Sequence, residues 1–413
     1  MASKSNIGTL ILKETPLEEI YGGTNQTAYT AGDILYASSS DTLDKLPIGI
    51  NGNVMKVFNG NVSWSIGFDF DLFYGPFPAN TASTTTITGL SSDIDKWNGG
   101  VLATNGKIYM IPYGSTSVLI IDPTTDTADI TTIAGLSGAA KWSGCVLAPN
   151  GKIYGIPWDS TSVLIVDPIT DTADITTITG LTGTNKWVGG VLAANGKIYG
   201  IPHNSTSILI IDPVTNTANT TSITGLTGAS KWSGGVMAPN GRIYGIPNVS
   251  TVVLIIDPVT NTASTTTITG LSGSNKWRGG VLSHDGRIYG IPRESTTVLI
   301  INPVTNTVNT TSITGLTGTD KWSGGILGPS GKIYGIAYDS TSVLIIDPVA
   351  NTANTTTITG LTGTDKFYGG VLAPNGKIYG VPRDSTSVLI INTGLPNGNL
   401  PLYFLLGAYV NKF

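Results

Sequence analysis

The 413-residue chain is poor in the residues that build disulfides and metal sites. It has a single cysteine, Cys145, which excludes an internal disulfide and a cysteine metal cluster. Its histidines are His203 and His284 alone, so a zinc site made of several histidines is excluded as well. We therefore expect no metal and no cofactor.

Charged side chains are also scarce, at 12% of the chain, and the formal net charge is −4. No run of lysine and arginine is present, so nothing favours binding to nucleic acid or to an anionic membrane surface. The apolar content of 40% argues against a disordered chain, which combines high charge with low apolar content.

Long apolar runs are missing too. The longest, from Leu402 to Val410, is interrupted by Gly407 and is shorter than the roughly 20 residues that span a bilayer. Lys13 and Glu14 cut short the apolar stretch that a signal peptide would need. We expect neither membrane insertion nor signal-peptide export, and we expect the apolar tail, residues 395–413, to pack on the N-terminal segment or on a partner chain.

The chain does contain an internal repeat of 45 residues. The units are rich in Thr, Ile, Val, Gly and Pro and lack a helical hydrophobic period, which indicates β-structure. Repeats of this length form solenoids, propellers or arrays. One aromatic residue follows a lysine in every unit: Trp97, Trp142, Trp187, Trp232, Trp277, Trp322 and Phe367.

Each unit predicts four short strands. In the unit 220–263, the segments 234–239 and 241–247 flank Asn240-Gly241, which is the signal for a type I′ hairpin. A third strand, 251–257, ends at Asp257-Pro258, and the segment TTSITG at 220–225 is expected to be the fourth. Four strands in about 45 residues make one propeller blade.

The two ends of the array complement each other. It begins with a lone TTTITG segment, residues 84–89, and ends with a third-strand segment, residues 387–392. If TTxITG is the outermost strand, residues 84–89 complete the last blade, join the ends of the ring and remove an open edge. The sequence thus predicts an all-β, seven-bladed β-propeller over residues 81–394. An open solenoid would not explain the complementary ends.

The constant residues of the repeat are interpreted as structural. A tryptophan at one fixed phase packs between blades, and Gly99-Gly100 with their copies lie in the innermost strand, where space is short. Cys145 replaces one of these glycines and is expected to be small and buried. The aspartates before proline fit Asx turns: Asp122, Asp167, Asp212, Asp257 and Asp347.

Two positions vary from unit to unit. Strand direction puts both on one face of the propeller. One follows Ile-Pro or its equivalent: Tyr113, Trp158, His203, Asn248, Arg293, Tyr338 and Arg383. The other follows the blade Trp or Phe: Asn98, Ser143, Val188, Ser233, Arg278, Ser323 and Tyr368. All of the first set, with Arg278 and Tyr368, are our candidate ligand-binding residues.

Tyr, Trp and Arg dominate binding hot spots, and aromatic rings with interspersed polar side chains suit sugars. The alternative is unselected drift at exposed loops, which would more often leave Ser, Thr or Lys.

Catalysis has little support, and no catalytic residue is assigned. No Ser-His-Asp trio is suggested by the two histidines. The pairs Asp93/Asp95 and Asp69/Asp71 lie outside the recurring core. A glycosidase needs two carboxylates about 5–10 Å apart, and a pair formed across blades is left open by the sequence.

Residues 1–80 do not share the repeat and hold little apolar material for a core of their own. Asn51-Gly52 and Asn59-Gly60 predict two hairpins there. From Gly22 to Trp64 the segment resembles a module common in bacteriophage tail fibres and other virion appendages, from which it departs at Asn25 and Met55. The matching residues are Gly22, Gly23, Thr24, Thr27, Tyr29, Gly32, Asp33, Leu35, Tyr36, Ala37, Ser38, Leu43, Leu46, Ile48, Gly49, Gly52, Val54 and Trp64.

The resemblance implies a virion protein. In that family such segments attach an appendage to the particle, often as trimers, and a distal domain binds the host. We accordingly expect residues 1–80 to contact other virion proteins and the propeller to bind a host surface glycan or protein. A purely structural decoration or joint, and less so a carbohydrate-active enzyme, are the alternatives.

Overall fold

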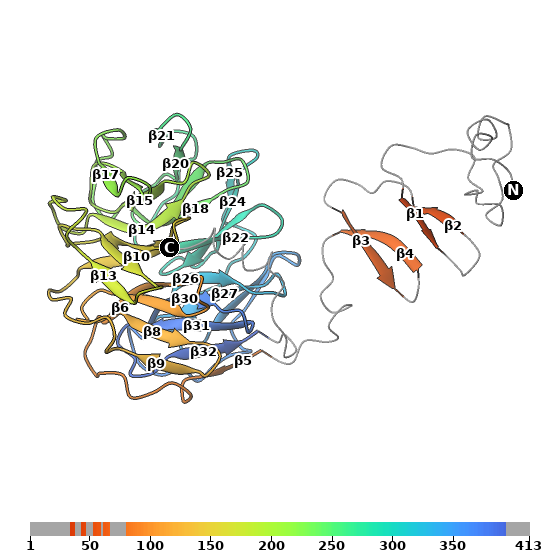
Figure 1. Ribbon diagram of the computed structural model, residues 1–413. Helices are drawn as coiled ribbons and strands as arrows, with labels where there is room; N and C mark the ends of the chain where they lie inside the picture. Colours follow the sequence, from red (N-terminus) through yellow and green to blue (C-terminus); the bar gives the residue numbers. More distant parts are fainter. Residues whose placement is uncertain (1–33, 38–42, 47–52, 59–60, 67–79, 394–413) are drawn as a thin grey trace, which may run out of the picture. The chain divides into compact units, whose positions relative to one another are not determined.

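The computed structural model describes residues 80–393 and the backbone of four strands nearer the N-terminus (Figure 1). The chain divides into two compact units, residues 1–77 and 78–413. The apolar tail, residues 395–413, lies outside the described residues, as does the turn Asn51-Gly52.

The first unit contains two antiparallel pairs: β1 (Ile34–Ala37) with β2 (Leu43–Leu46), and β3 (Asn53–Phe58) with β4 (Asn61–Ile66). Phe58 pairs with Asn61, which confirms the hairpin predicted at Asn59-Gly60. Strands β2 and β3 belong to different two-stranded sheets, and the hairpin predicted at Asn51-Gly52 lies outside the described residues.

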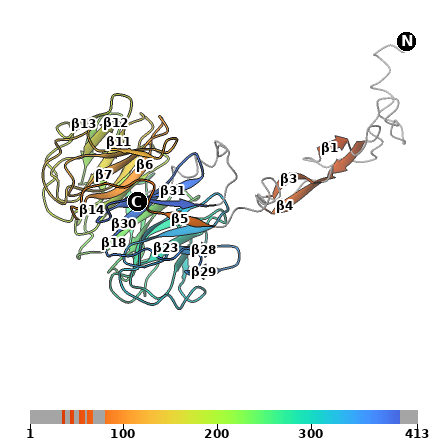
Figure 2. The ribbon, with the colours of Figure 1, turned by 90° about the horizontal axis from the view of Figure 1, so that it is seen from below.

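The second unit is a seven-bladed propeller of four-stranded antiparallel sheets, as the repeat predicts (Figures 1 and 2). The innermost strands are β6 (Trp97–Leu102), β10 (Trp142–Leu147), β14 (Trp187–Leu192), β18 (Trp232–Met237), β22 (Trp277–Leu282), β26 (Trp322–Leu327) and β30 (Phe367–Leu372). The second strands are β7 (Ile108–Pro112), β11 (Ile153–Pro157), β15 (Ile198–Pro202), β19 (Ile243–Pro247), β23 (Ile288–Pro292), β27 (Ile333–Ala337) and β31 (Lys377–Pro382).

The third strands are β8 (Leu119–Asp122), β12 (Leu164–Asp167), β16 (Leu209–Asp212), β20 (Leu254–Asp257), β24 (Leu299–Asn302), β28 (Leu344–Asp347) and β32 (Leu389–Asn392). The outermost strands are β9 (Thr127–Asp129), β13 (Thr172–Asp174), β17 (Thr217–Asn219), β21 (Thr262–Ser264), β25 (Thr307–Asn309), β29 (Thr352–Asn354) and, from the start of the array, β5 (Thr81–Ser83).

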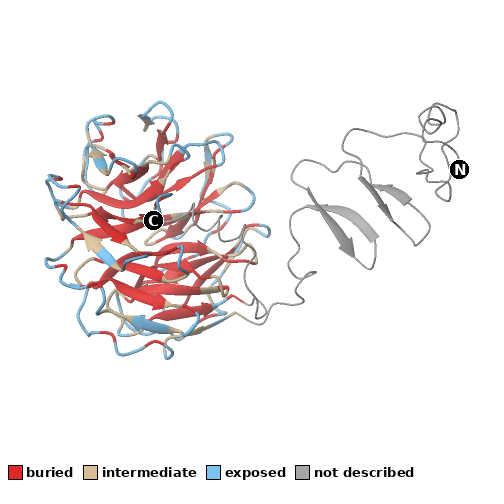
Figure 3. Cartoon of the chain, in the orientation of Figure 1, coloured by how far each residue is buried: buried red, intermediate tan, exposed pale blue. Residues whose placement is uncertain are grey.

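The hydrophobic core lies between adjacent blades, and the inner strands are buried while the loops are exposed (Figure 3). Trp142 of the second blade clusters with Ile111, Val118 and Ile133 of the first, which confirms the packing role predicted for the recurring tryptophan. Cys145 belongs to the same cluster and is buried, as expected.

The outermost strand differs from the prediction. It is the three-residue segment before TTxITG, and the TTxITG segment itself is bent. The cause is the residue that ends the strand: Asp129 Oδ1 accepts hydrogen bonds from the backbone N–H and the hydroxyl of Thr131, at 2.7 and 2.8 Å, which competes with the strand ladder. Ile133 and Leu136 then turn into the core.

Ring closure by the start of the array is confirmed, although through β5 and not through residues 84–89. Strand β5 pairs antiparallel with β32, with Ala82 opposite Ile391. Just before β5, Asn80 Oδ1 accepts a hydrogen bond of 2.8 Å from the Tyr334 hydroxyl of the preceding blade. The last blade is therefore completed by residues more than 300 positions away in the sequence.

The hairpin turns are not of type I′, which needs positive φ at both central residues. Of the two turn residues in the first blade, Asn105 and Gly106, only Gly106 has positive φ, 81°. Its N–H bonds Ala103 O at 3.1 Å, and Ala103 N–H bonds Lys107 O at 2.8 Å, so the loop is one residue longer than predicted. Asn105 stabilises the turn through its side chain, whose Oδ1 accepts a hydrogen bond from Lys107 N–H.

Candidate functional site

The two faces of the propeller are formed by different loops. On one face, Tyr113 N–H bonds Lys96 O at 2.8 Å, joining the loop between second and third strands to the start of the innermost strand. On the other, Asn105 Nδ2 donates to Pro168 O of the next blade at 2.9 Å, joining a hairpin turn to an Asp-Pro loop. We call these the variable face and the turn face.

A cavity of about 240 Å³ opens on the variable face, and every blade contributes to its lining. The candidate residues named from the sequence are all brought together here. The lining residues are Asn98, Tyr113, Ser143, Trp158, Val188, His203, Ser230, Ser233, Asn248, Asn275, Arg278, Arg293, Tyr338, Tyr368 and Arg383.

Three consecutive blades supply an arc of partly exposed rings. The centroids of Tyr113 and Trp158 are 6.4 Å apart, and those of Trp158 and His203 are 4.8 Å apart. His203 Nδ1 lies 3.2 Å from Trp232 O. A carbonyl can only accept, so Nδ1 carries the proton and Nε2 is left as an acceptor. Burial lowers the pKa of His203 to about 4, so the ring is neutral at physiological pH.

A second group of rings also lines the cavity. Tyr338 and Tyr368 are buried and meet edge to face with centroids 6.4 Å apart. The Arg278 guanidinium carbon lies 5.3 and 5.1 Å from these two centroids, and that of Arg383 lies 5.6 and 5.7 Å away. Both cations therefore lie within cation–π distance of the same two rings.

The three arginines differ in their acidic partners. Arg383 forms an ion pair with Asp95, and Arg293 forms one with Asp320. Arg278 forms no ion pair with any described residue. The cavity lining itself contains no aspartate or glutamate.

Several buried polar atoms of the cavity lack a hydrogen-bond partner among the described residues: Asn98 Oδ1, Asn248 Oδ1, Arg278 Nη1 and Arg383 Nε. Asn98 and Asn248 are each only 3% exposed. A buried polar group left unpaired costs roughly 1–3 kcal/mol. Two acceptors and two donors of cavity-lining residues are thus left unpaired.

The lysine before each blade tryptophan fixes the loops that carry these residues. Lys141 Nζ donates to Tyr113 O, Ser115 O and Gly138 O at 3.1, 2.8 and 2.6 Å. Burial lowers the pKa of this lysine to about 8. This role of the lysine was not predicted, although the sequence has a lysine before the tryptophan or phenylalanine in every unit.

A second set of ties rigidifies the variable face. Asp159 Oδ1 accepts from Asn185 N–H at 2.6 Å, and Asn204 Oδ1 accepts from Ser230 N–H at 2.8 Å. The residue directly before each lysine, which is Asn185 or Ser230 in these two cases, has φ near 50° in every blade. Two of these residues, Ser230 and Asn275, line the cavity but were not predicted as site residues. Their position also varies from unit to unit, which could have identified them from the sequence.

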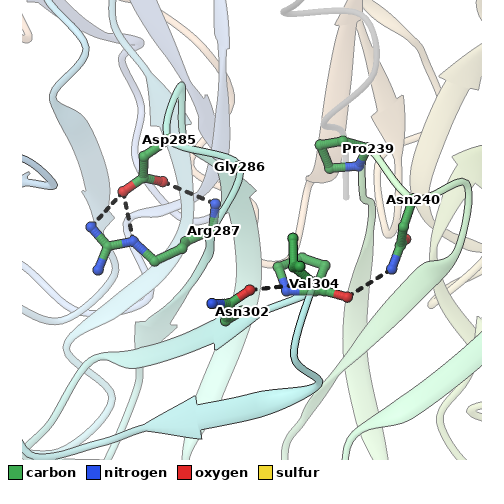
Figure 4. Close-up of a pocket in the computed structure, with 8 residues that line it drawn as sticks. Pro239, Asn240, Asp285, Gly286, Arg287, Asn302 and Val304 are labelled. Atoms are coloured by element: carbon green, nitrogen blue, oxygen red, sulfur yellow. Dashed lines mark hydrogen bonds and ion pairs between the residues drawn. The ribbon is translucent and has the colours of Figure 1, made fainter. Parts of the chain in front are cut away.

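The turn face holds another cavity, of about 430 Å³, between the fourth and fifth blades (Figure 4). Its polar groups already bond one another: Arg287 pairs with Asp285, Asn240 Nδ2 donates to Pro303 O at 2.9 Å, and Val304 N–H donates to Asn302 Oδ1 at 2.9 Å. Such a site offers a ligand fewer free groups than the cavity of the variable face.

The part of the chain that the structure describes contains no group of three or more His, Cys, Asp or Glu that could hold a metal ion. No helix among the described residues is long and apolar enough to cross a membrane.

Comparison with known proteins shows the fold. No family model matches the chain, and no curated protein matches its sequence. A streptogramin B lyase structure is 12% identical with a TM-score of 0.61, covering 76% of this chain and 98% of its own. A catalytically inactive virginiamycin B lyase from Staphylococcus aureus, solved with quinupristin, is 10% identical with a TM-score of 0.61 and covers 76% and 99%.

A further similar structure is the extracellular domain of a putative hybrid two-component system from B. thetaiotaomicron. It is 14% identical with a TM-score of 0.58, covering 90% of this chain and 52% of its own. At these identities the chain shares with these proteins the seven-bladed propeller fold alone.

Proposed function

We propose that the propeller is a receptor-binding domain whose variable face holds a carbohydrate, and that the chain is an appendage of a virus particle. One observation carries the first part. Residues that vary between otherwise near-identical units line one cavity, where buried donors and acceptors have no partner.

Carbohydrate is the class that suits these groups. A sugar presents C–H faces that stack on rings such as Trp158 and Tyr113, and hydroxyls that both donate and accept hydrogen bonds. The unpaired Asn98 and Asn248 oxygens can accept from hydroxyls, and the arginine N–H groups can donate to them. The rigid loops limit the entropy lost on binding.

The virion part of the proposal rests on the ordered motif between Gly22 and Trp64. In this proposal residues 1–80 attach the chain to other particle proteins, as a trimer, and the propeller is the distal domain.

The turn face supports a second candidate function, a structural joint between particle proteins. In five consecutive blades the proline of the Asp-Pro or Asn-Pro loop is followed by a branched apolar residue that is 84–95% exposed: Ile169, Val214, Val259, Val304 and Val349. Exposed apolar residues repeated on one face are suited to contacts with a partner.

A glycan array and a host-cell binding assay on the full chain distinguish the receptor-binding role from the structural joint. The assays compare matched substitutions on the two faces. We expect the double variant Trp158→Ala with Tyr113→Ala to lose binding, because both stacking rings are removed. The control, Val214→Ser with Val259→Ser, should bind like the wild type. Binding unaffected by the first variant would contradict the receptor role of the variable face, and loss only in the second would place that role on the turn face. No binding by the wild-type chain would favour the joint.

A further inference from the structure

The strongest unexplained feature of the cavity is an excess of positive charge. Three arginines converge on a lining without an acid, and two of them are neutralised by Asp95 and Asp320. Arginine does not lose its charge in proteins, so the third, Arg278, stays cationic. Charges that are partly removed from water interact more strongly, because solvent screens them less.

The surroundings of Arg278 leave its donors unused. The guanidinium lies against the Tyr338 and Tyr368 rings, whose faces attract a cation but are poor acceptors for its in-plane N–H groups. Nη1 is buried with no hydrogen-bond partner among the described residues, and so is Nε of Arg383 on the same two rings. An anionic oxygen beside such a donor would form charge-assisted hydrogen bonds.

We infer that the sugar bound at the variable face carries an anionic group, a carboxylate or a sulfate, and that Arg278 receives it. This deepens the proposed carbohydrate-binding function and rests on it. The Trp158 and Tyr113 rings stack on the sugar, the Asn98 and Asn248 oxygens accept its hydroxyls, and Arg278 selects the charge.

The same surface argues against a polyanion. Asp159, Asp339 and Asp384 follow the variable residues, and their Oδ1 atoms accept backbone N–H groups at 2.6, 2.6 and 2.7 Å. These carboxylates repel a highly charged chain, and the protein carries a net charge of −4. One anionic group within a sugar therefore fits better than a nucleic acid.

The test measures affinities of the full chain for sugars that differ only in charge. Sialyllactose and its methyl ester form the carboxylate pair, and sulfated lactose and lactose form the sulfate pair. We expect the charged member of one pair to bind roughly ten- to hundredfold more tightly, as charge-assisted hydrogen bonds do. That preference should shrink as salt is added.

Arg278→Gln should remove the preference while binding of the neutral member persists, and Arg278→Lys, which keeps the charge without the planar fork, should restore part of it. Arg242→Gln is the matched control, since Arg242 pairs with Asp257 on the turn face. Thermal unfolding checks that each variant is folded.

Equal affinity for the charged and neutral sugars overturns the inference and leaves carbohydrate binding in place. A preference that survives Arg278→Gln overturns the assignment of this arginine. If neither member of either pair binds, the proposed carbohydrate function fails together with the inference.

Discussion

At the residue scale, two glycines with similar positive φ play different roles. Gly99 in β6 has φ of 88°, and a Cβ there would lie 2.8 Å from Gly144 Cα of the next blade. Gly106 in the hairpin turn has φ of 81°, and a Cβ there would meet nothing within 4 Å. The first glycine is needed for a close approach of two backbones and the second only for its conformation.

The substitutions Gly99→Ala and Gly106→Ala separate these two causes. We expect Gly106→Ala to lower the free energy of unfolding by about 1 kcal/mol, the cost of a left-handed alanine. Gly99→Ala should lower it by about 3 kcal/mol or more, because neighbouring backbone must also move. Urea unfolding measures both free energies. Equal losses would show that the close approach of Gly99 to Gly144 in the next blade does not restrict the side chain at position 99.

His203 provides a pH-dependent signal for the cavity. Its pKa is about 4 in the folded protein, below the ordinary 6.5, so the unfolded chain binds the proton first as pH falls. The unfolding free energy should therefore fall from pH 6.5 to 4, relative to His203→Asn, by on the order of 2 kcal/mol, and level off below pH 4. A difference between wild type and variant that stays constant with pH would contradict the buried neutral ring.

At the element scale, hydrophobic alternation and turn residues identified the blades, because three strands per unit are packed by residues such as Trp142 and Ile153. The outermost strand was misplaced, since Thr-rich segments favour strands in general while the Asp129 side chain locally takes the backbone N–H groups. The turn type was missed because Asn-Gly suits more than one hairpin loop, and pairing register decides between them.

Adjacent blades are tied on the turn face by a tyrosine of the second strand. Tyr154 Oη donates to Asn216 Oδ1 of the next blade at 2.7 Å and accepts from Asn150 Nδ2 at 3.0 Å. The fifth blade lacks this tie: the Tyr289 hydroxyl lies 3.4 Å from Asp285 of its own blade, and Asn351 Oδ1 is buried without a partner.

The chain thus contains its own control for the value of the tie. We expect Tyr154→Phe to lower the free energy of unfolding by about 1–1.5 kcal/mol, because Asn216 loses its partner. Tyr289→Phe should have a clearly smaller effect. Chemical denaturation compares the two, and a loss at Tyr289 as large as at Tyr154 would mean that the hydroxyl matters for reasons other than the contact between blades.

At the scale of the whole molecule, the ring depends on a strand supplied by the start of the array. A chain beginning at residue 78 keeps β5 and Asn80, whereas a chain beginning at residue 84 loses both. We expect the shorter chain to melt at least about 5 °C lower, since β32 becomes an open edge. Identical melting temperatures would show that closure through β5 adds no stability.

The position of the candidate site was predictable, because comparison of the units with one another identified the loops and strand direction put them on one face. The charge arrangement was not. The pairing of Arg383 with Asp95 joins residues from the two ends of the array, and that of Arg293 with Asp320 joins adjacent blades. The sequence shows which acids and arginines are present but not which of them lie close together. Arg278 therefore could not be recognised as the arginine of the cavity without an acidic partner.

The most direct test of sugar binding at the variable face is a tryptophan fluorescence titration of the full chain with sugars that it retains on a glycan array. Trp158 lines the cavity, whereas the blade tryptophans, such as Trp142, are buried in the core. We predict a saturable change in emission that disappears in Trp158→Phe. A sugar that binds without changing Trp158 emission, or a change that persists in Trp158→Phe, would place the binding site elsewhere on the protein.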